Sequence, residues 1–287
     1  MRVNYVYASQ LGIGTYDVGG LSVDVYTLPL GFDWNFGRDL DLEAPVRESR
    51  DWALEFNFPV SYGRFDLNGT NQQGQSADVS QQVLAIVPGL ALRAPISDNW
   101  RVKPFMNFGY GNIVSTEGTT YDPTAGTQSV GQPDNRSFII YSAGVSSLYQ
   151  IPFGLYTFAL GNGVTFAGNT ELGSDAFSEN YWAIETGLEL RRSLGFRLGQ
   201  AGLSNTGIAG LEPELGGYFI HYFFPDPLKF GSIDGDTLEV MNQFEFGVTL
   251  GSATDWELLS IRNPKIGASY IFGDDLKVFR VNFGFPF

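Results

Sequence analysis

The chain has 287 residues, of which 43% are hydrophobic, 15% aromatic and only 17% charged, and its formal net charge is -14. Charged residues make up about 25% of a typical soluble domain, so this composition favours a protein whose surface does not all face water. The longest apolar stretch, VLAIVPGLAL (83–92), contains Pro88-Gly89, and a spanning helix needs roughly 20 apolar residues. A transmembrane helix is therefore excluded, and the absence of cysteine is consistent with export through an oxidising compartment.

Apolar and polar residues alternate along most of the chain. In WALEFNFPVSY, for example, Trp52, Leu54 and Phe56 share one face and Ala53 and Glu55 share the other. This period of two predicts strands whose two faces meet different surroundings. The predicted strands cover residues 3–14, 21–36, 51–66, 79–94, 100–115, 136–150, 153–166, 179–194, 207–224, 237–250, 258–272 and 276–287.

All twelve predicted strands exceed ten residues, whereas strands in globular proteins average about 5–6. A β-sandwich is the alternative, but strands of a sandwich do not need apolar residues along such a length. In hydrocarbon only helices and closed barrels satisfy every backbone polar group. We therefore predict an all-β, closed, antiparallel up-and-down transmembrane β-barrel with 12 strands, formed by residues 1–287 as a single domain.

The connections predict the orientation of this barrel. Bacterial barrels have short periplasmic turns, longer outer loops and both termini on one side. Short predicted turns are 95–99 and 150–152, and long polar loops are 67–78, 116–135, 167–178 and 225–236. The segment 37–50 is long for an inner turn, and 273–275 is short for an outer loop.

Aromatic and glycine residues add to this interpretation. In the predicted orientation, four tryptophans lie at the periplasmic ends of their strands, namely Trp34, Trp52, Trp100 and Trp256, while Trp182 lies near an outer end. Aromatic girdles are expected at both interfaces of a membrane barrel. The glycine-rich stretch 10–20 fits a bend in the barrel.

Charged residues of both signs fall on the face predicted to line the lumen. These candidates are Glu55, Arg101, Lys103, Glu185, Glu189, Arg191, Glu239, Glu245, Lys265 and Arg280. Pairs of such charges could close the lumen or set its ion preference. The alternative is that they are solvated or mutually paired wall residues without a selective role.

No catalytic, cofactor-binding or metal-binding residue is predicted. A lipid hydrolase in the barrel wall would need a histidine with a nearby serine and an asparagine that orients the imidazole. The single histidine, His221, is followed by Tyr222 and Phe223, so that local pattern is missing. Motifs of the G-x-S-x-G, H-E-x-x-H and P-loop types are also absent.

The last ten residues, VFRVNFGFPF, place Phe279, Val281, Phe283, Phe285 and Phe287 on one face. This segment resembles the C-terminal signature of Gram-negative outer-membrane barrels, in which a final aromatic follows apolar residues at every second position. The resemblance implies that these five residues are read by the barrel-assembly machinery during insertion. We further expect this strand to pair with the first strand near VNYVYAS (3–9).

The size and strand pattern of the whole chain resemble the translocator domain of autotransporters, here without a visible passenger. The resemblance implies a barrel in the cell outer membrane, in contact with outer-membrane lipids and lipopolysaccharide. We further expect a monomer with periplasmic termini and no nucleic-acid partner or cofactor. The first functional hypothesis is a passive pore or translocation conduit. The second is a structural or interaction barrel with a blocked lumen, acting through outer loops or a periplasmic partner. A lipid-modifying enzyme is the third.

Overall fold

The computed structural model describes fifteen stretches of the chain: 13–18, 21–28, 31–36, 52–70, 76–115, 118–122, 127–131, 135–173, 178–197, 211–231, 237–253, 257–258, 261–262, 265–274 and 276–283. Every regular element in these stretches is a β-strand. None of them contains a helix long and apolar enough to cross a membrane.

The described stretches contain nineteen strands. They are β1 (Ile13–Val18), β2 (Leu21–Leu28), β3 (Gly31–Asn35), β4 (Ala53–Asn57), β5 (Val60–Thr70), β6 (Ser76–Ile86), β7 (Gly89–Ser97), β8 (Trp100–Ser115), β9 (Gly118–Asp122), β10 (Thr127–Gly131), β11 (Asn135–Phe153), β12 (Tyr156–Glu171), β13 (Ser178–Ser193), β14 (Pro213–Gly231), β15 (Thr237–Ser252), β16 (Glu257–Leu258), β17 (Ile261–Arg262), β18 (Ile266–Gly273) and β19 (Leu276–Phe283). All but β16 and β17 belong to one 17-stranded sheet.

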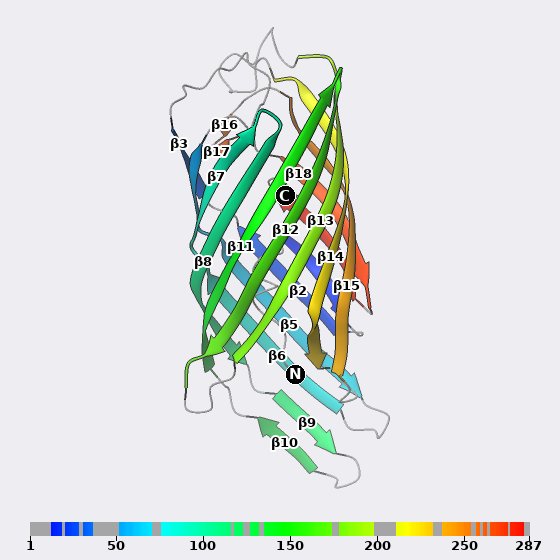
Figure 1. The fold of residues 1–287 in the computed structure, drawn as a ribbon. Helices are drawn as coiled ribbons and strands as arrows, with labels where there is room; N and C mark the ends of the chain where they lie inside the picture. Colours follow the sequence, from blue (N-terminus) through cyan, green and yellow to red (C-terminus); the bar gives the residue numbers. More distant parts are fainter. Residues whose placement is uncertain are drawn as a thin grey trace.

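Long tilted strands wrap around a shared interior (Figure 1). One end of the molecule carries the tight turns Ser97–Trp100 and Phe153–Tyr156, and we call it the short-turn end. The other end carries β9 and β10, at the bottom of Figure 1, and we call it the hairpin end. Every pairing in the sheet is antiparallel, as the alternating apolar and polar pattern predicts for strands with two different faces.

Prolines interrupt two of the long strands without ending the wall. Pro59 separates β4 from β5, and Pro88 separates β6 from β7. Proline has no backbone N–H and so cannot donate to the ladder. The carbonyl oxygens still take part, because Pro59 accepts from the N–H of Val87 at 3.2 Å and Pro88 accepts from that of Phe108 at 2.9 Å.

The first and last described strands of the sheet pair with each other. β1 runs antiparallel to β19, with Ile13 opposite Val281 and Val18 opposite Leu276. The predicted partner of β19, the segment 3–9, lies outside the described residues, and the observed partner starts at Ile13. Of the glycine-rich stretch 10–20, the structure describes 13–18, where Gly14 lies within β1 opposite Arg280. The predicted bend stays a prediction, since a glycine within a strand is compatible with one.

All four expected loops contain strand instead. In the predicted loop 67–78, β5 continues to Thr70 and β6 begins at Ser76. The predicted loop 116–135 includes the β9–β10 hairpin, and β9 pairs with Ser76–Asp78 of β6. The strand β12 continues to Glu171, and β14 continues to Gly231 past Pro225 and Pro227, with a register shift between Phe223 and Leu228. Glycine, threonine and proline in these segments favoured the prediction of loops. Hairpin pairing accommodates them in β9 and β10, and a bulge accommodates the prolines of β14. The segment 37–50 lies outside the described residues.

Candidate functional site on the covered face

The two faces of the sheet differ in polarity. Charged side chains are buried on one face and large apolar side chains are exposed on the other, which is the reverse of a soluble protein. On β13, Glu189 and Arg191 are 1% and 5% exposed, whereas Trp182 and Leu190 on the opposite face are 46% and 49% exposed. We call these the covered face and the exposed face. Charged residues are rarely fully buried unless paired, and large exposed apolar surfaces mark contact with membrane or protein. The exposed face therefore has the chemistry that hydrocarbon requires.

An apolar cluster fills the covered face toward the hairpin end. Its members come from strands around the sheet, and they include Ile140 on β11, Phe224 and Leu228 on β14, and Ile271 on β18, each at most 1% exposed. Phe224 packs edge-on against Tyr181 of β13, with ring centroids 6.0 Å apart. That contact joins neighbouring strands, whereas the cluster as a whole includes residues of strands that are not neighbours, such as Ile140 on β11 and Ile271 on β18.

A charged layer occupies the covered face toward the short-turn end. The guanidinium of Arg191 lies 3.4 Å from the Glu189 carboxylate and 3.5 Å from the Glu214 carboxylate. The hydroxyl of Thr249 donates to Glu189 at 3.3 Å. Breaking one partner of a buried ion pair costs much more than the pair itself contributes, so this layer ties β13, β14 and β15 together.

Glu245 on β15 is the centre of a second polar group and is fully buried. Its carboxylate accepts hydrogen bonds from Tyr218 at 2.9 Å, Tyr222 at 2.7 Å and Arg280 at 2.6 Å. The ring of Tyr218 reaches Glu245 over Gly247, where a Cβ atom would lie 2.2 Å from the ring. Glycine at 247 is therefore a condition for this network.

Glu55 on β4 joins a further set of charges. Its carboxylate lies 3.5 Å from the Arg93 guanidinium and 3.3 Å from the Lys103 ammonium. The three side chains come from β4, β7 and β8, which are consecutive neighbours in the sheet. Together with the two groups above, this set places cations beside carboxylates, so the charged layer has no large region of one sign among the residues described.

The other predicted lumen residues divide into two groups. Arg101, Lys265 and Arg280 are buried at 9%, 5% and 8% exposure, and Glu185 is half-buried. Glu239, in contrast, is exposed, while the next residue, Val240, is fully buried. Simple alternation fails there because the bulge in β14 shifts the partner register of β15.

Sequence reasoning missed Arg93, Glu214, Tyr218 and Tyr222 as members of the charged layer. Arg93 is an even number of residues from the buried Ala85 and Ala91. The alternation of faces along the strand would therefore have placed it on the covered face. Tyr218 and Tyr222 were missed because the sequence analysis expected aromatic side chains to face lipid.

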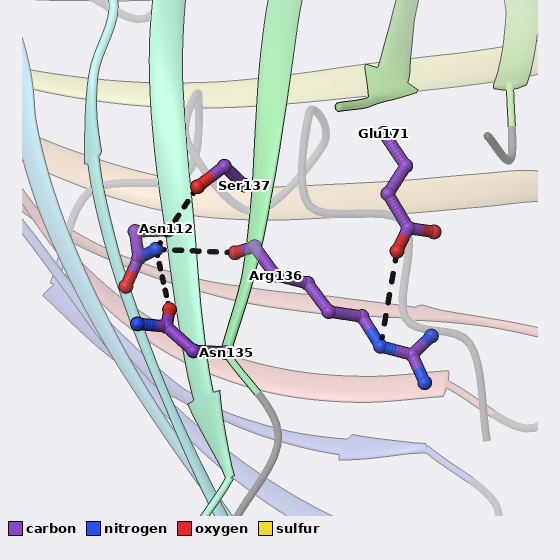
Figure 2. A network of polar contacts seen from close by, with 5 residues as sticks. All are labelled: Asn112, Asn135, Arg136, Ser137 and Glu171. Carbon is purple, nitrogen blue, oxygen red and sulfur yellow. Dashed lines mark hydrogen bonds and ion pairs between the residues drawn. The ribbon is translucent and has the colours of Figure 1, made fainter. Parts of the chain in front are cut away.

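At the hairpin end, polar side chains of β8, β11 and β12 form a network (Figure 2). The amide nitrogen of Asn112 donates to Asn135 Oδ1 at 2.7 Å, to Ser137 Oγ at 3.2 Å and to the Arg136 carbonyl at 3.3 Å. The Arg136 guanidinium turns the other way and lies 3.8 Å from Glu171. These contacts connect β8, β11 and β12 close to their hairpin ends.

Aromatic side chains border the apolar band on the exposed face. Near the hairpin end, Phe166 lies between Tyr141 and Trp182, with centroid distances of 6.2 and 5.0 Å. Near the short-turn end, Phe153 stacks on Tyr156 at 5.6 Å. Trp34, Trp52 and Trp100 are exposed at this same end, as predicted, and Trp256 lies outside the described residues.

The terminal strand follows the predicted faces as far as it is described. Phe279 is 59% exposed and Arg280 is buried on the opposite face. Val281 is half-buried. The side chain of Phe283 and the whole of Phe285 and Phe287 lie outside the described part of the chain.

The single histidine lies on the exposed face of β14. Its Nε2 atom is 3.0 Å from Asn242 Oδ1 on β15, and its ring stacks on Phe244. Within the described stretches, no group of three or more His, Cys, Asp or Glu residues is placed to hold a metal ion.

Comparison with known proteins identifies the fold. No protein-family model and no curated protein sequence matches this chain. Solved structures do match. The β domain of the Bordetella autotransporter BrkA aligns over 94% of this chain and 93% of its own, with a TM-score of 0.54 and 12% identity. The translocator domain of the Neisseria meningitidis autotransporter NalP aligns over 96% and 85%, with a TM-score of 0.58 and 12% identity. The chain thus resembles autotransporter translocator barrels in fold.

Proposed function

We propose that residues 1–287 form a single, monomeric outer-membrane barrel of the translocation type, closed by twelve strands. The observation that carries this proposal is the inversion of the two faces, with paired charges covered and apolar side chains exposed. The pairing of β1 with β19 supports closure. The count becomes twelve when β2–β3, β4–β5 and β6–β7 are each taken as one wall strand and the small hairpins β9–β10 and β16–β17 are left out.

The burial of the covered face favours a conduit that is occluded at rest over a permanently open pore. A twelve-stranded barrel encloses more space than the side-chain-filled eight-stranded case, and a water-filled lumen would leave Glu189, Glu245 and Ile271 accessible. Each of them is at most 1% exposed. Translocation through this barrel therefore requires displacement of the apolar cluster or the charged layer.

The experiment is single-channel recording of the purified barrel in a planar bilayer. We expect a silent or rarely opening baseline at low voltage, with steps appearing when the interior is disrupted by mutation or denaturant. Large, stable conductance steps in the wild-type protein would contradict the occluded state while leaving the barrel in place. A protein that does not insert at all would contradict the membrane assignment itself.

The second candidate is an interaction barrel with a permanently blocked lumen. The extended β9–β10 hairpin favours it, because this hairpin adds structured surface beyond the wall at the hairpin end. A barrel that stays silent even after the interior is disrupted supports this second function. We regard enzymatic activity as absent in either case, and loss of a lipid-hydrolysing activity on His221→Ala would contradict that expectation.

The orientation and biogenesis complete the proposal. The short turns Ser97–Trp100 and Phe153–Tyr156 support a periplasmic short-turn end, where β1 begins at Ile13 and β19 ends at Phe283. Periplasmic termini are part of this proposal. Outer-membrane lipids and lipopolysaccharide would then surround the exposed face. We propose that Phe279, Val281, Phe283, Phe285 and Phe287 are read by the barrel-assembly machinery before β19 pairs with β1.

A further inference from the structure

Five polar residues interrupt the apolar band of the exposed face. They are Ser147 on β11, Asn162 on β12, Thr186 on β13, His221 on β14 and Asn242 on β15, and we call them the polar stripe. Asn162 and Thr186 are exposed and the other three are half-buried. The outward positions around them are apolar and include Val145, Val164, Ile184 and Leu188, which are 40–48% exposed.

The five residues form one continuous row across neighbouring strands. Ser147 is the register partner of Asn162, Asn162 of Thr186, and Thr186 of His221. The row ends in the hydrogen bond of 3.0 Å between His221 and Asn242. Isolated polar residues scattered over the wall would not line up in this way.

The polar stripe runs from one border of the apolar band toward the other. Ser147 lies near the short-turn end of β11 and accepts a hydrogen bond of 2.8 Å from the indole N–H of Trp100. Thr186 lies at the middle of β13. Asn242 lies toward the hairpin end of β15, and its backbone N–H donates to Asp274 in the β18–β19 turn at 3.0 Å. The tilt of the strands in Figure 1 turns a register row into such a diagonal.

The middle of the polar stripe calls for a partner from outside the chain. In the described part of the protein, the side chains of Asn162 and Thr186 make no hydrogen bond, although the residues at both ends of the stripe do. A polar group that faces hydrocarbon without a partner carries a desolvation cost. The path between the two interfaces therefore offers donors and acceptors at midspan that only a membrane component can use.

We infer that the polar stripe is a path along which phospholipid headgroups cross the bilayer on the outside of the wall. Amide, hydroxyl and imidazole groups can each hydrogen-bond a phosphate or glycerol ester. The stripe contains no carboxylate to repel a phosphate and no lysine or arginine to hold it. Transit needs sites strong enough to enter and weak enough to leave, which this neutral series provides. A single docking spot for a protein partner would not need to extend from border to border.

This inference rests on the proposed membrane location and is independent of the interior. The test uses liposomes of phosphatidylcholine with a trace of acyl-labelled fluorescent phosphatidylcholine, reconstituted with the full chain. Dithionite bleaches only label in the outer leaflet. We expect wild-type protein to make the inner-leaflet label reducible, and the Asn162→Leu/Thr186→Val variant to lose this effect. The control variant Val164→Leu/Leu188→Val, on the same two strands beside the stripe, should behave as wild type.

Two further measurements separate the possible failures. Entrapped water-soluble fluorophore must stay protected, since its bleaching would assign the effect to leakage and overturn the path. The wild-type protein could insert and show heat-modifiable mobility, yet move lipid no faster than empty liposomes. That result would overturn the lipid path and leave the membrane assignment in place. Failure to insert would overturn it together with the membrane assignment. Release of free fatty acid that is lost in His221→Ala would overturn transit in favour of lipid hydrolysis.

Discussion

Arg280 on β19 reaches across β18 to Glu245 on β15, with 2.6 Å between the guanidinium nitrogen and the carboxylate oxygen. The register places Ile271 of β18 between Glu245 and Val278 of β19. The contact therefore joins strands that are not neighbours, on the covered face. It ties β19, the last described strand, to the wall in addition to its backbone pairing.

Removing one member of this pair should destabilise the fold. Arg280→Ala leaves the Glu245 carboxylate buried with fewer donors, and breaking a buried pair costs about 3–5 kcal/mol. We expect the free energy of unfolding, measured by urea denaturation in liposomes, to fall by that order. The double variant Arg280→Met/Glu245→Leu removes both charges and should recover part of the loss. Equal stability of Arg280→Ala and wild type would contradict the assignment of this pair to the interior.

A charge placed on the exposed face should be costly at midspan. Met106 on β8 is 62% exposed, and Arg at the midplane of a barrel wall costs about 2–4 kcal/mol. We expect Met106→Arg to lower the unfolding free energy in liposomes by that order and Met106→Leu to leave it nearly unchanged. If the protein tolerated Met106→Arg without loss, Met106 would face water.

The apolar cluster should act as the barrier to conduction. Phe224 is a fully buried member of this cluster, and Phe→Ala in a core costs about 3–5 kcal/mol and leaves a cavity. We expect Phe224→Ala to produce brief conductance steps that wild type lacks. Phe279→Ala, which removes an exposed aromatic, serves as the control and should stay silent. Steps in the control but not in Phe224→Ala would place the barrier elsewhere.

The orientation can be tested because the chain contains no cysteine. Leu155 lies in a turn at the short-turn end. Gly173 follows β12 at the hairpin end, and a Cβ atom added there would meet nothing within 4 Å. A membrane-impermeant maleimide should label Gly173→Cys on intact cells and Leu155→Cys only after lysis. The reverse pattern would invert the proposed orientation.

The alternation of residue types predicted the two faces of the wall well. Trp182 and Phe279 lie on the exposed face, and Glu189 and Arg280 lie on the covered face, as expected. This succeeds because a strand has a strict period of two, and lipid and interior select opposite chemistries. The same reasoning failed at Glu239, because the phase changes with a register shift whose prolines lie on the partner strand β14 and not on β15 itself.

Contacts across the interior could not be predicted from alternation. The meeting of Glu245 with Tyr218, Tyr222 and Arg280 depends on strand register, on side-chain rotamers and on the glycine at 247. The polar stripe was hidden for a related reason. Ser147, Asn162 and Thr186 are unremarkable in their own strands and become a row only when the register aligns them.

The most direct test of the account is the behaviour of the purified chain toward detergent and heat. A barrel with an apolar exposed face should stay in the membrane fraction, need detergent for extraction, and migrate faster in an unheated gel sample than in a boiled one. A chain that is soluble without detergent and shows one mobility before and after boiling would contradict the outer-membrane barrel.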